Sequence, residues 1–427
     1  MTIHIITLLA CMLCPLAATP ASDYKEMIRN NPETASGEFY HYIYTPTKET
    51  PAPKGYKPFY ISHYGRHGSR YHTGPLYFRR TISPLLKADS LGILSAEGQK
   101  LLADLQKLSD IHQGHFGMLT ERGINEHREI AYRMYKRYPQ VFSGKAGRDR
   151  IICKSSVAPR CMASMANFMS SLQQHCASNI NARMYCSDSI QHIVAPDRDL
   201  KDIIAREEIM EDSIRHAEYQ SKKFMNRIFT DTQQAHEIIS DPIFWMKHIL
   251  DCGSIVSNLP SGPNIIRYFT QEELEGLWVA RNARFYYLLG SSRECPECPH
   301  LLADALINDI VENADHAVSQ HSRVTADFRF GHDTVVLSLA FLIGLNGMNG
   351  HLSAAKVQHL WNCTRQICMA SNIQFIFYRN NKDDIIVKCL YNEQEHMIPS
   401  LDSPYKCYYS WKDLRKHLMS LPLTTEK

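Results

Sequence analysis

The sequence predicts an α/β protein in which a central, mostly parallel sheet is flanked by helices and carries a large α-helical insertion. Two observations favour this class. Three short strands are each followed by a tight turn and a helix, an order typical of parallel strands in α/β proteins. Between the second and third of these units, residues 199–319 have mainly helical patterns. A chain of 427 residues is long enough for both parts.

The first part of the chain supplies two of the three strands. Residues 22–57 look irregular and contain several prolines, so regular structure is expected only after them. The elements that follow are a strand at Phe59–His63, helices beginning after Ser95 and Thr120, a strand at Ile151–Cys153 and a helix from Arg160. We assign residues 22–198 to an α/β core.

The later part of the chain changes character twice. A capping box at Thr270–Glu273 begins one of the helices in residues 199–319. The elements after this region are a strand at Thr325–Phe330, a buried helix at Val335–Leu342 and a hairpin of Ile373–Arg379 with Ile385–Tyr391. We therefore assign residues 320–427 to the core and residues 199–319 to a helical cap inserted into it.

The N-terminus predicts export. Residues 1–21 contain an apolar stretch followed by small residues, the pattern of a cleaved signal peptide. A membrane anchor is disfavoured because the stretch is short and interrupted by Pro15. Leu8–Cys11 also resembles a bacterial lipobox, so a lipid anchor at Cys11 is the alternative to a free protein. We expect a periplasmic or secreted protein without a membrane span.

The charge and the cysteine pattern argue against a nucleic-acid-binding protein and against a zinc site. A net charge of +3 with mixed signs along the chain argues against nucleic acid as a partner. The 13 cysteines include one isolated CxxC at Cys295–Cys298, which lacks the second pair that a zinc site would need. A disulfide or two loop thiols is the favoured interpretation of this pair.

The three strand–turn–helix units carry basic groups at their turns. The first contains Arg66, His67 and Arg70, the second ends at Arg160, and the third contains His332 and Asp333. Ligands of open α/β sheets bind beyond the carboxyl ends of the strands, so neighbouring parallel strands would bring these residues into one pocket.

The composition of this pocket indicates phosphate chemistry. Guanidinium groups match phosphate oxygens, and an imidazole kept neutral by nearby cations is an available nucleophile. Asp333 is the only acid in the set and can protonate a leaving oxygen. Since the arginines themselves neutralise the phosphoryl group, we expect neither a metal nor another cofactor. The expected partner is a small phosphate monoester.

These motifs resemble those of the histidine acid phosphatases, branch 2 of the histidine phosphatase superfamily, which includes phytases and multiple inositol polyphosphate phosphatases. Arg66–Arg70 is similar to the family's RHGxR run, and His332-Asp333 to its distal HD pair. Leu119–Pro139 resembles the family's "L-T-x-x-G…H…RYP" helix, and Ser155–Phe168 the segment with its third arginine.

The resemblance implies a phosphoglycerate mutase-like core and a role for each motif residue. His67 would be the phosphohistidine nucleophile and Asp333 the proton donor, which implies an acidic working range if Asp333 must enter protonated. The implied phosphate ligands are Arg66, Arg70, Arg160 and His332.

Two departures from the family's patterns leave the substrate open. His72 and Gly74 stand where many phytases have proline and lysine, and His332-Asp333-Thr334 replaces the His-Ala-Glu of inositol polyphosphate phosphatases. A His-Ala-Glu triplet at His216–Glu218 lies within the helical cap with no strand before it, and we interpret it as unrelated to catalysis.

The candidates for a specificity pocket are His63, His72 and Lys154, each as easily structural. Inositol polyphosphates, including phytate, and sugar phosphates are the candidate substrates. Two other functions stay open: a phosphomutase of the same superfamily, and a catalytically silent phosphate-binding protein.

Overall fold

The computed structural model describes residues 23–143, 150–176, 180–196, 221–290, 292, 298–319, 322–348 and 350–421. The expected signal peptide, the lipobox at Cys11 and the triplet at His216–Glu218 lie outside these residues. So do Cys295 and the side chain of Cys298.

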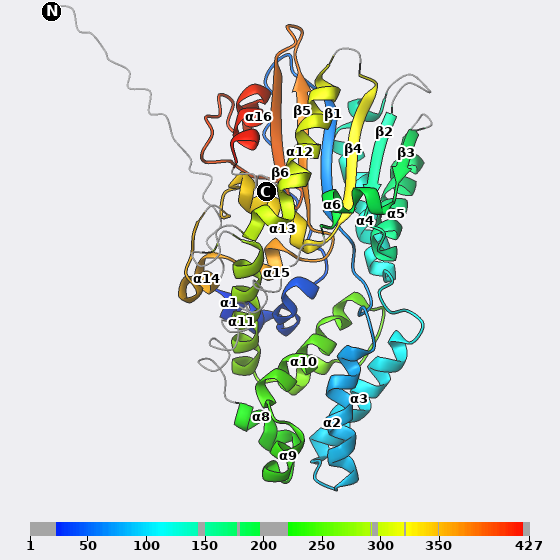
Figure 1. Ribbon diagram of the computed structural model, residues 1–427, viewed down its shortest axis with the longest axis vertical. Helices are drawn as coiled ribbons and strands as arrows, with labels where there is room; N and C mark the ends of the chain where they lie inside the picture. The colour runs from blue at the N-terminus through cyan, green and yellow to red at the C-terminus, as the bar shows by residue number, and fades with distance from the viewer. Residues whose placement is uncertain are drawn as a thin grey trace, which may run out of the picture.

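One sheet of eight strands forms the centre of the molecule, in the order β3-β2-β4-β1-β5-β6-β7, with β8 paired to β6 (Figure 1). The strands are β1 (Lys57–Arg66), β2 (Arg150–Ser155), β3 (Asn181–Tyr185), β4 (Val324–Gly331), β5 (Asn372–Arg379), β6 (Ile385–Tyr391), β7 (Gln394–Glu395) and β8 (Tyr408–Ser410). Strands β3, β2, β4 and β1 are parallel, whereas β1 pairs with β5, and β5 with β6, in antiparallel fashion. The expected α/β class is confirmed, and the predicted hairpin forms the antiparallel half of a mixed sheet.

Helices cover both faces of this sheet (Figure 1). α4 (Glu121–Arg137) and α5 (Pro159–His175) pack together on one face, while α12 (Cys298–Val318), α13 (Asp333–Ile343) and α16 (Trp411–Ser420) lie on the other. Strand β1 serves both cores because its side chains alternate: Ile61 belongs to the α4–α5 core, and Tyr60 and Tyr64 belong to the opposite one.

A group of helices forms the opposite end of the molecule from the sheet (Figure 1). Its members are α2 (Leu76–Ser90), α3 (Ala96–His112), α8 (Ser221–Ile228), α9 (Thr232–Ile238) and α10 (Pro242–Ser254). Because α2 packs on α3 and α10, this group combines helices from before and after the second strand of the core. In contrast, α12, near the end of the expected cap, contacts β1 and β4. The domain boundaries at 198 and 320 stay a prediction.

The remaining helical elements are shorter or connect these parts. They are α1 (Tyr24–Asn30), η1 (Pro32–Phe39), η2 (Pro139–Phe142), η3 (Asp188–Ile190), α6 (Gln191–Val194), η4 (Val256–Asn258), η5 (Ile265–Tyr268), α11 (Gln271–Leu289), α14 (Ala354–Leu360) and α15 (Cys363–Gln366). The predicted helix starts hold: Ser95 and Thr120 cap α3 and α4, and Thr270 forms a complete capping box with Glu273 at the start of α11.

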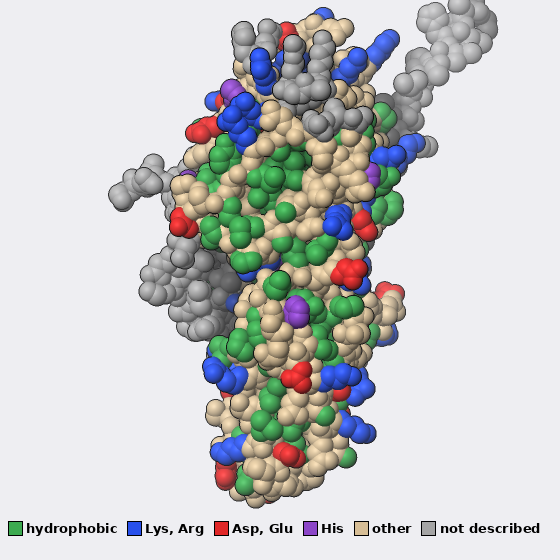
Figure 2. Space-filling model, turned by 90° about the vertical axis from the view of Figure 1, so that its right-hand side faces the viewer, with side chains coloured by type: hydrophobic (Ala, Val, Ile, Leu, Met, Phe, Trp, Pro, Cys, Tyr) green, Lys and Arg blue, Asp and Glu red, His purple; other side chains and the backbone are tan. Residues whose placement is uncertain are grey.

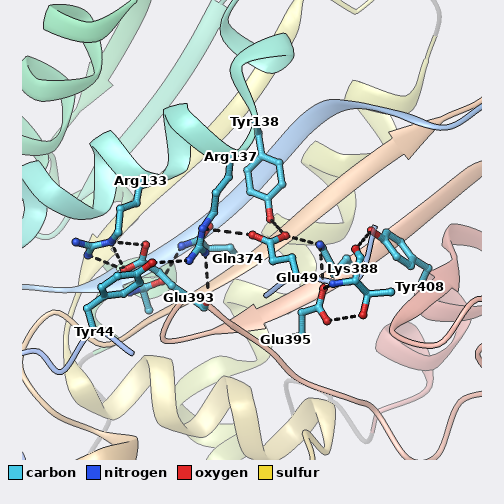
Figure 3. A network of polar contacts seen from close by, with 12 residues as sticks. Tyr44, Glu49, Arg133, Arg137, Tyr138, Gln374, Lys388, Glu393, Glu395 and Tyr408 are labelled. Atoms are coloured by element: carbon cyan, nitrogen blue, oxygen red, sulfur yellow. Dashed lines mark hydrogen bonds and ion pairs between the residues drawn. The ribbon is translucent and has the colours of Figure 1, made fainter. Parts of the chain in front are cut away.

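A buried polar network joins α4 to the antiparallel half of the sheet (Figure 3). Arg133 binds the Glu393 carboxylate through Nη2 at 2.7 Å, and Arg137 lies 3.3 Å from Glu49. Lys388, only 1% exposed, pairs with both Glu49 and Glu395. Each buried charge therefore has an opposite partner, without which its burial would be costly.

The visible surface carries charges of both signs. Figure 2 shows basic and acidic side chains interspersed over the visible face. No helix within the part of the chain that the structure describes is both long and apolar enough to cross a bilayer.

Candidate active site

The three turns predicted to carry the chemistry lie at one edge of the sheet. Strand β4 lies between β1 and β2, with Arg66 opposite Gly331 and Ser155 opposite Phe330. The His67 backbone N–H donates to the Gly331 carbonyl at 2.9 Å. Because the strands are parallel and in register, the residues that follow them meet, as the sequence predicted.

His67 has the tautomer that a nucleophile needs. Its ring is 2% exposed, and Nδ1 lies 2.9 Å from the Gly68 carbonyl oxygen. A carbonyl can only accept, so Nδ1 carries the proton and Nε2 keeps its lone pair. Burial first, and then the charges of Arg66, Arg70 and other cations, lower the pKa of His67 well below its ordinary value. The imidazole therefore stays neutral under acidic conditions.

Arg66 is fully buried, and hydrogen bonds to backbone carbonyls fix its guanidinium group. Its Nη1 donates to the backbone carbonyls of Glu38, at 2.7 Å, and Ile367, while Nη2 lies 2.7 Å from Asp333 Oδ2. The guanidinium thus has a set position at the end of β1.

Arg70 and Arg160 complete a cationic cluster. Arg70 Nη1 donates to the Tyr71 carbonyl, and its guanidinium lies over the Phe39 ring, 5.5 Å from the centroid. Burial lowers the pKa of Arg70 to about 10, and the neighbouring charges of Arg160 and Arg66 add to the shift. Each of these arginines also lowers the pKa of His67. Asp333 is the only acid among the predicted site residues, so the cluster has an excess of positive charge suited to an anion.

His332 and Asp333 lie at the start of α13, directly after β4. His332 Nε2 lies 3.2 Å from Ser156 Oγ, and the His332 and His67 ring centroids are 5.7 Å apart. Burial lowers the pKa of His332 to about 4, and Arg160 adds to this effect. These contacts bring the predicted phosphate ligands of all three turns together.

The electrostatic surroundings of Asp333 oppose its protonation in the free site. Burial raises its pKa, but the charges of Arg66, His332 and Arg70 outweigh burial and hold the pKa below its ordinary value. The Thr334 N–H, which donates to Asp333 Oδ1 at 2.9 Å, acts in the same direction. Asp333 is thus a carboxylate in the free site. A phosphate dianion bound beside it would raise its pKa by repulsion between like charges.

The three candidates for a specificity pocket do not line one. His63 is 2% exposed and packs against Phe168, Phe328 and Phe330 in the core between the sheet and α5. Alternation along β1 explains this: the side chain of His63 points to the helix-covered face and not to the end of the strand. The prediction for His63 is therefore corrected to a packing role.

His72 and Lys154 are also structural. His72 is fully buried, stacked on Tyr77 and His112 at centroid distances of 4.4 and 5.3 Å. Lys154 forms an ion pair with Asp309 of α12, which also binds Arg329. Both side chains are held by neighbours that the sequence does not place beside them, and neither is free to select a substrate.

Two polar residues near the site were missed. Arg284 of α11 lies within electrostatic range of Asp333: burial lowers its pKa, and the acidic groups Glu38 and Asp333 oppose the shift. Glu126 of α4 binds Ser69, inside the turn Arg66–Arg70 that follows β1. Both missed residues lie on helices with a buried face, where a charge is an anomaly that could have marked them.

A separate cavity of about 380 Å³ lies beside Glu126. Its walls also include Tyr42, Tyr44, Arg122 and Asn258, and none of the predicted phosphate ligands lines it. In the described residues no group of three or more His, Cys, Asp or Glu side chains is arranged to hold a metal ion.

Comparisons with family models and with curated proteins give one match. A family model described as "Histidine phosphatase superfamily (branch 2)" matches residues 255–392, which include His332 and Asp333. A search of curated proteins finds no match.

Solved structures share the fold at low identity. The multiple inositol polyphosphate phosphatase of Bifidobacterium longum, in complex with inositol hexasulfate, is 18% identical with a TM-score of 0.73, covering 92% of this chain and 99% of that one. The phytase from D. castellii is 13% identical with a TM-score of 0.69, covering 92% of this chain and 86% of its own. Together with the family model, these likenesses confirm the resemblance to branch 2 of the histidine phosphatases that the motifs predicted.

Proposed function

We propose, from this resemblance and the site geometry, that the chain is a phosphomonoesterase that works without a metal through a phosphohistidine at His67. The observation that carries the proposal is the bond of His67 Nδ1 to the Gly68 carbonyl, which leaves Nε2 as a lone-pair donor beside the arginine cluster. The same arrangement would not be needed merely to bind phosphate. The match to a phosphatase family model supports the proposal.

In the first step, the Nε2 lone pair of His67 attacks phosphorus as the bond from phosphorus to the ester oxygen breaks. Arg66, Arg70, Arg160 and His332 bind the phosphoryl oxygens, and their charge stabilises the transition state. The leaving alkoxide takes a proton from Asp333. The products of this step are the alcohol, the phosphohistidine and an Asp333 carboxylate.

In the second step, the Asp333 carboxylate takes a proton from a water molecule as that water attacks the phosphohistidine. The phosphorus–nitrogen bond breaks, which leaves a neutral His67 and a protonated Asp333. When inorganic phosphate leaves, Asp333 releases this proton, and the site returns to a neutral His67 and an Asp333 carboxylate. A carboxylate that is ionised in the free site thus gains its proton when phosphate binds. Mild acid favours that gain, whereas His67 remains unprotonated there because of its lowered pKa.

We infer that the preferred substrate carries more than one anionic group. Arg284 brings a further positive charge within electrostatic range of Asp333, the proposed proton donor. The Bifidobacterium longum structure contains inositol hexasulfate, a polyanion, in a protein of the same fold. Inositol polyphosphates are therefore our first candidates, and sugar phosphates our second.

The mechanism is tested with His67→Ala and a generic aryl phosphate near pH 5. We expect hydrolysis to fall by at least about a thousandfold because the covalent path is lost. His359→Ala, which removes an exposed histidine on α14, is the matched control and should keep full activity. Comparable hydrolysis by the wild type and His67→Ala would refute the mechanism.

Asp333→Asn separates the two roles of the acid. Aryl phosphates have good leaving groups, so this variant should still form phosphohistidine from them but should lose turnover on alkyl phosphates. Equal loss of phosphohistidine formation on both would show that Asp333 is not the proton donor. Stoichiometric release of inorganic phosphate would exclude the phosphomutase alternative, and activity that persists in a chelator would support the metal-free reaction.

We also propose that the protein is exported. The support is the apolar N-terminal segment with small residues near Ala18 and Ala21. N-terminal sequencing of the mature protein should find a start near residue 22. A mature chain that begins at an acylated Cys11 would instead establish the lipid-anchored alternative.

A further inference from the structure

Ser69 lies in the middle of the turn Arg66–Arg70, which we call the nucleophile turn, and each of its polar atoms has a hydrogen-bond partner. Its N–H donates to Glu126 Oε2 at 2.7 Å, and its carbonyl accepts from the Thr120 N–H at 3.0 Å and hydroxyl at 3.1 Å. Its hydroxyl lies 2.7 Å from Glu126 Oε1 and 3.1 Å from Asn258 Oδ1. We call Thr120, Glu126 and Asn258 the Ser69 clamp.

The backbones of α4 and of the turn are in close contact, with no free space between them. A Cβ on Gly123 would lie 2.0 Å from the Ser69 carbonyl oxygen, and one on Gly68 would lie 2.5 Å from the Gly123 carbonyl oxygen. Only glycine fits at either position, so the first turn of α4 packs directly on the backbone that follows His67.

Glu126 is the one clamp residue whose two oxygens both receive backbone donors. Oε2 accepts from the Ser69 N–H, and Oε1 accepts from the Tyr42 N–H at 3.0 Å. The side chain is 7% exposed, and its burial raises its pKa. A carboxyl group suits this place because an amide would point its own N–H groups at one of the two backbone donors.

Glu126 also joins the turn to the rest of the fold. Tyr42, whose N–H it accepts, donates its hydroxyl to Glu393 at 3.0 Å, and Glu393 binds Arg133 in the network of Figure 3. Asn258, which shares the Ser69 hydroxyl, donates to the Phe39 carbonyl at 2.9 Å. The turn is thus held against both the sheet network and the helical part.

We propose that Glu126 is a positioning residue that sets the geometry of the nucleophile turn through the backbone of Ser69, without touching substrate. This inference rests on the proposed function. Ser69 lies between Gly68, whose carbonyl selects the His67 tautomer, and the phosphate ligand Arg70. A shift of Ser69 therefore displaces the nucleophile and a ligand together, and a misplacement of about 1 Å can cost about a hundredfold in rate.

The decisive variant is Glu126→Gln, which keeps the size of the side chain but turns one acceptor into a donor. Rapid-quench measurements with an aryl phosphate give two quantities: the burst amplitude, which counts correctly folded sites, and the burst rate of each site. We expect the amplitude to be retained and the burst rate to fall about a hundredfold. A residue needed only for folding would lower the amplitude and leave the rate of the remaining sites unchanged.

Two further variants sharpen this test. Glu121→Gln makes the same chemical change on the exposed first turn of α4 and should keep the wild-type burst rate. Glu126→Asp keeps both acceptors on a shorter arm, so it should recover part of the rate, and it replaces Glu126→Gln in the comparison if that variant does not fold. Wild-type burst rates in both Glu126 variants would overturn the proposal, as would equal losses in Glu121→Gln.

Hydrogen exchange provides a readout that needs no reaction. The Ser69 amide should exchange much faster in Glu126→Gln than in the wild type, because its acceptor is lost. Unchanged exchange would overturn the inference. If the wild type forms no phosphohistidine, the proposed function fails, and exchange still decides whether Glu126 holds the turn.

Discussion

Replacing His63 by leucine should make the protein markedly less sensitive to acid. Burial lowers the pKa of His63 to about 3, and the charges of His127 and Arg329 act in the same direction. In the unfolded chain the same imidazole has its ordinary pKa near 6.5. Between these two values the unfolded state binds a proton that the folded state does not, so stability rises with pH and is lost as pH falls.

The size of the effect follows from the two pKa values. From pH 7 to pH 5, His63 alone should lower the free energy of unfolding by about 2 kcal/mol. Leucine has a similar volume and suits the three surrounding phenylalanine rings, and it leaves no buried nitrogen without a hydrogen bond, as Nδ1 of His63 is now. Between pH 7 and pH 5, the free energy of unfolding of His63→Leu should therefore fall by about 2 kcal/mol less than that of the wild type.

Urea unfolding at pH 7, 6 and 5, followed by tryptophan fluorescence, measures this difference. Any change in packing affects all three pH values equally, so the difference in pH dependence isolates the titration of His63. His359→Leu, at an exposed position, is the control. Parallel pH profiles for the wild type and His63→Leu would refute the reasoning. An altered KM in this variant near pH 7 would contradict the packing role and restore His63 to the substrate pocket.

Three other outcomes are expected. Arg284→Ala should raise KM about tenfold for an inositol polyphosphate and leave KM for an aryl phosphate nearly unchanged, because only the former has a second anionic group to lose a charge-assisted contact; a substrate panel measures both. Gly123→Ala should lower both Tm and activity, since its Cβ would lie 2.0 Å from the Ser69 carbonyl oxygen; wild-type values of both would show that the backbone relaxes at little cost. Lys388→Met should destabilise the protein by about 2 kcal/mol in urea unfolding, because Glu395 loses its cation and Glu49 keeps only Arg137; a neutral effect would mean that the network of Figure 3 adds no net stability.

The elements that the sequence predicted are those whose signals are local. A polar cap before an apolar periodic run placed the starts of α3, α4 and α11, because capping bonds lie within a few residues. The hairpin of β5 and β6 was visible in the same way. The sequence did not predict that helices from two separate segments combine at one end of the molecule. Nothing in the sequence of α2 indicates its contact with α10.

The sequence itself predicted which candidate site residues come together. His67 and His332 each follow a strand directly, so once the strands are parallel neighbours their distance is set by backbone geometry. Tertiary structure decided the rest. Alternation along β1 turned His63 into the core, the buried face of α4 brought Glu126 to Ser69, and the charge of Arg66 made Asp333 a carboxylate in the free site. A motif specifies which groups are present, whereas burial and the charge of neighbours distant in sequence decide where they point and which protons they hold.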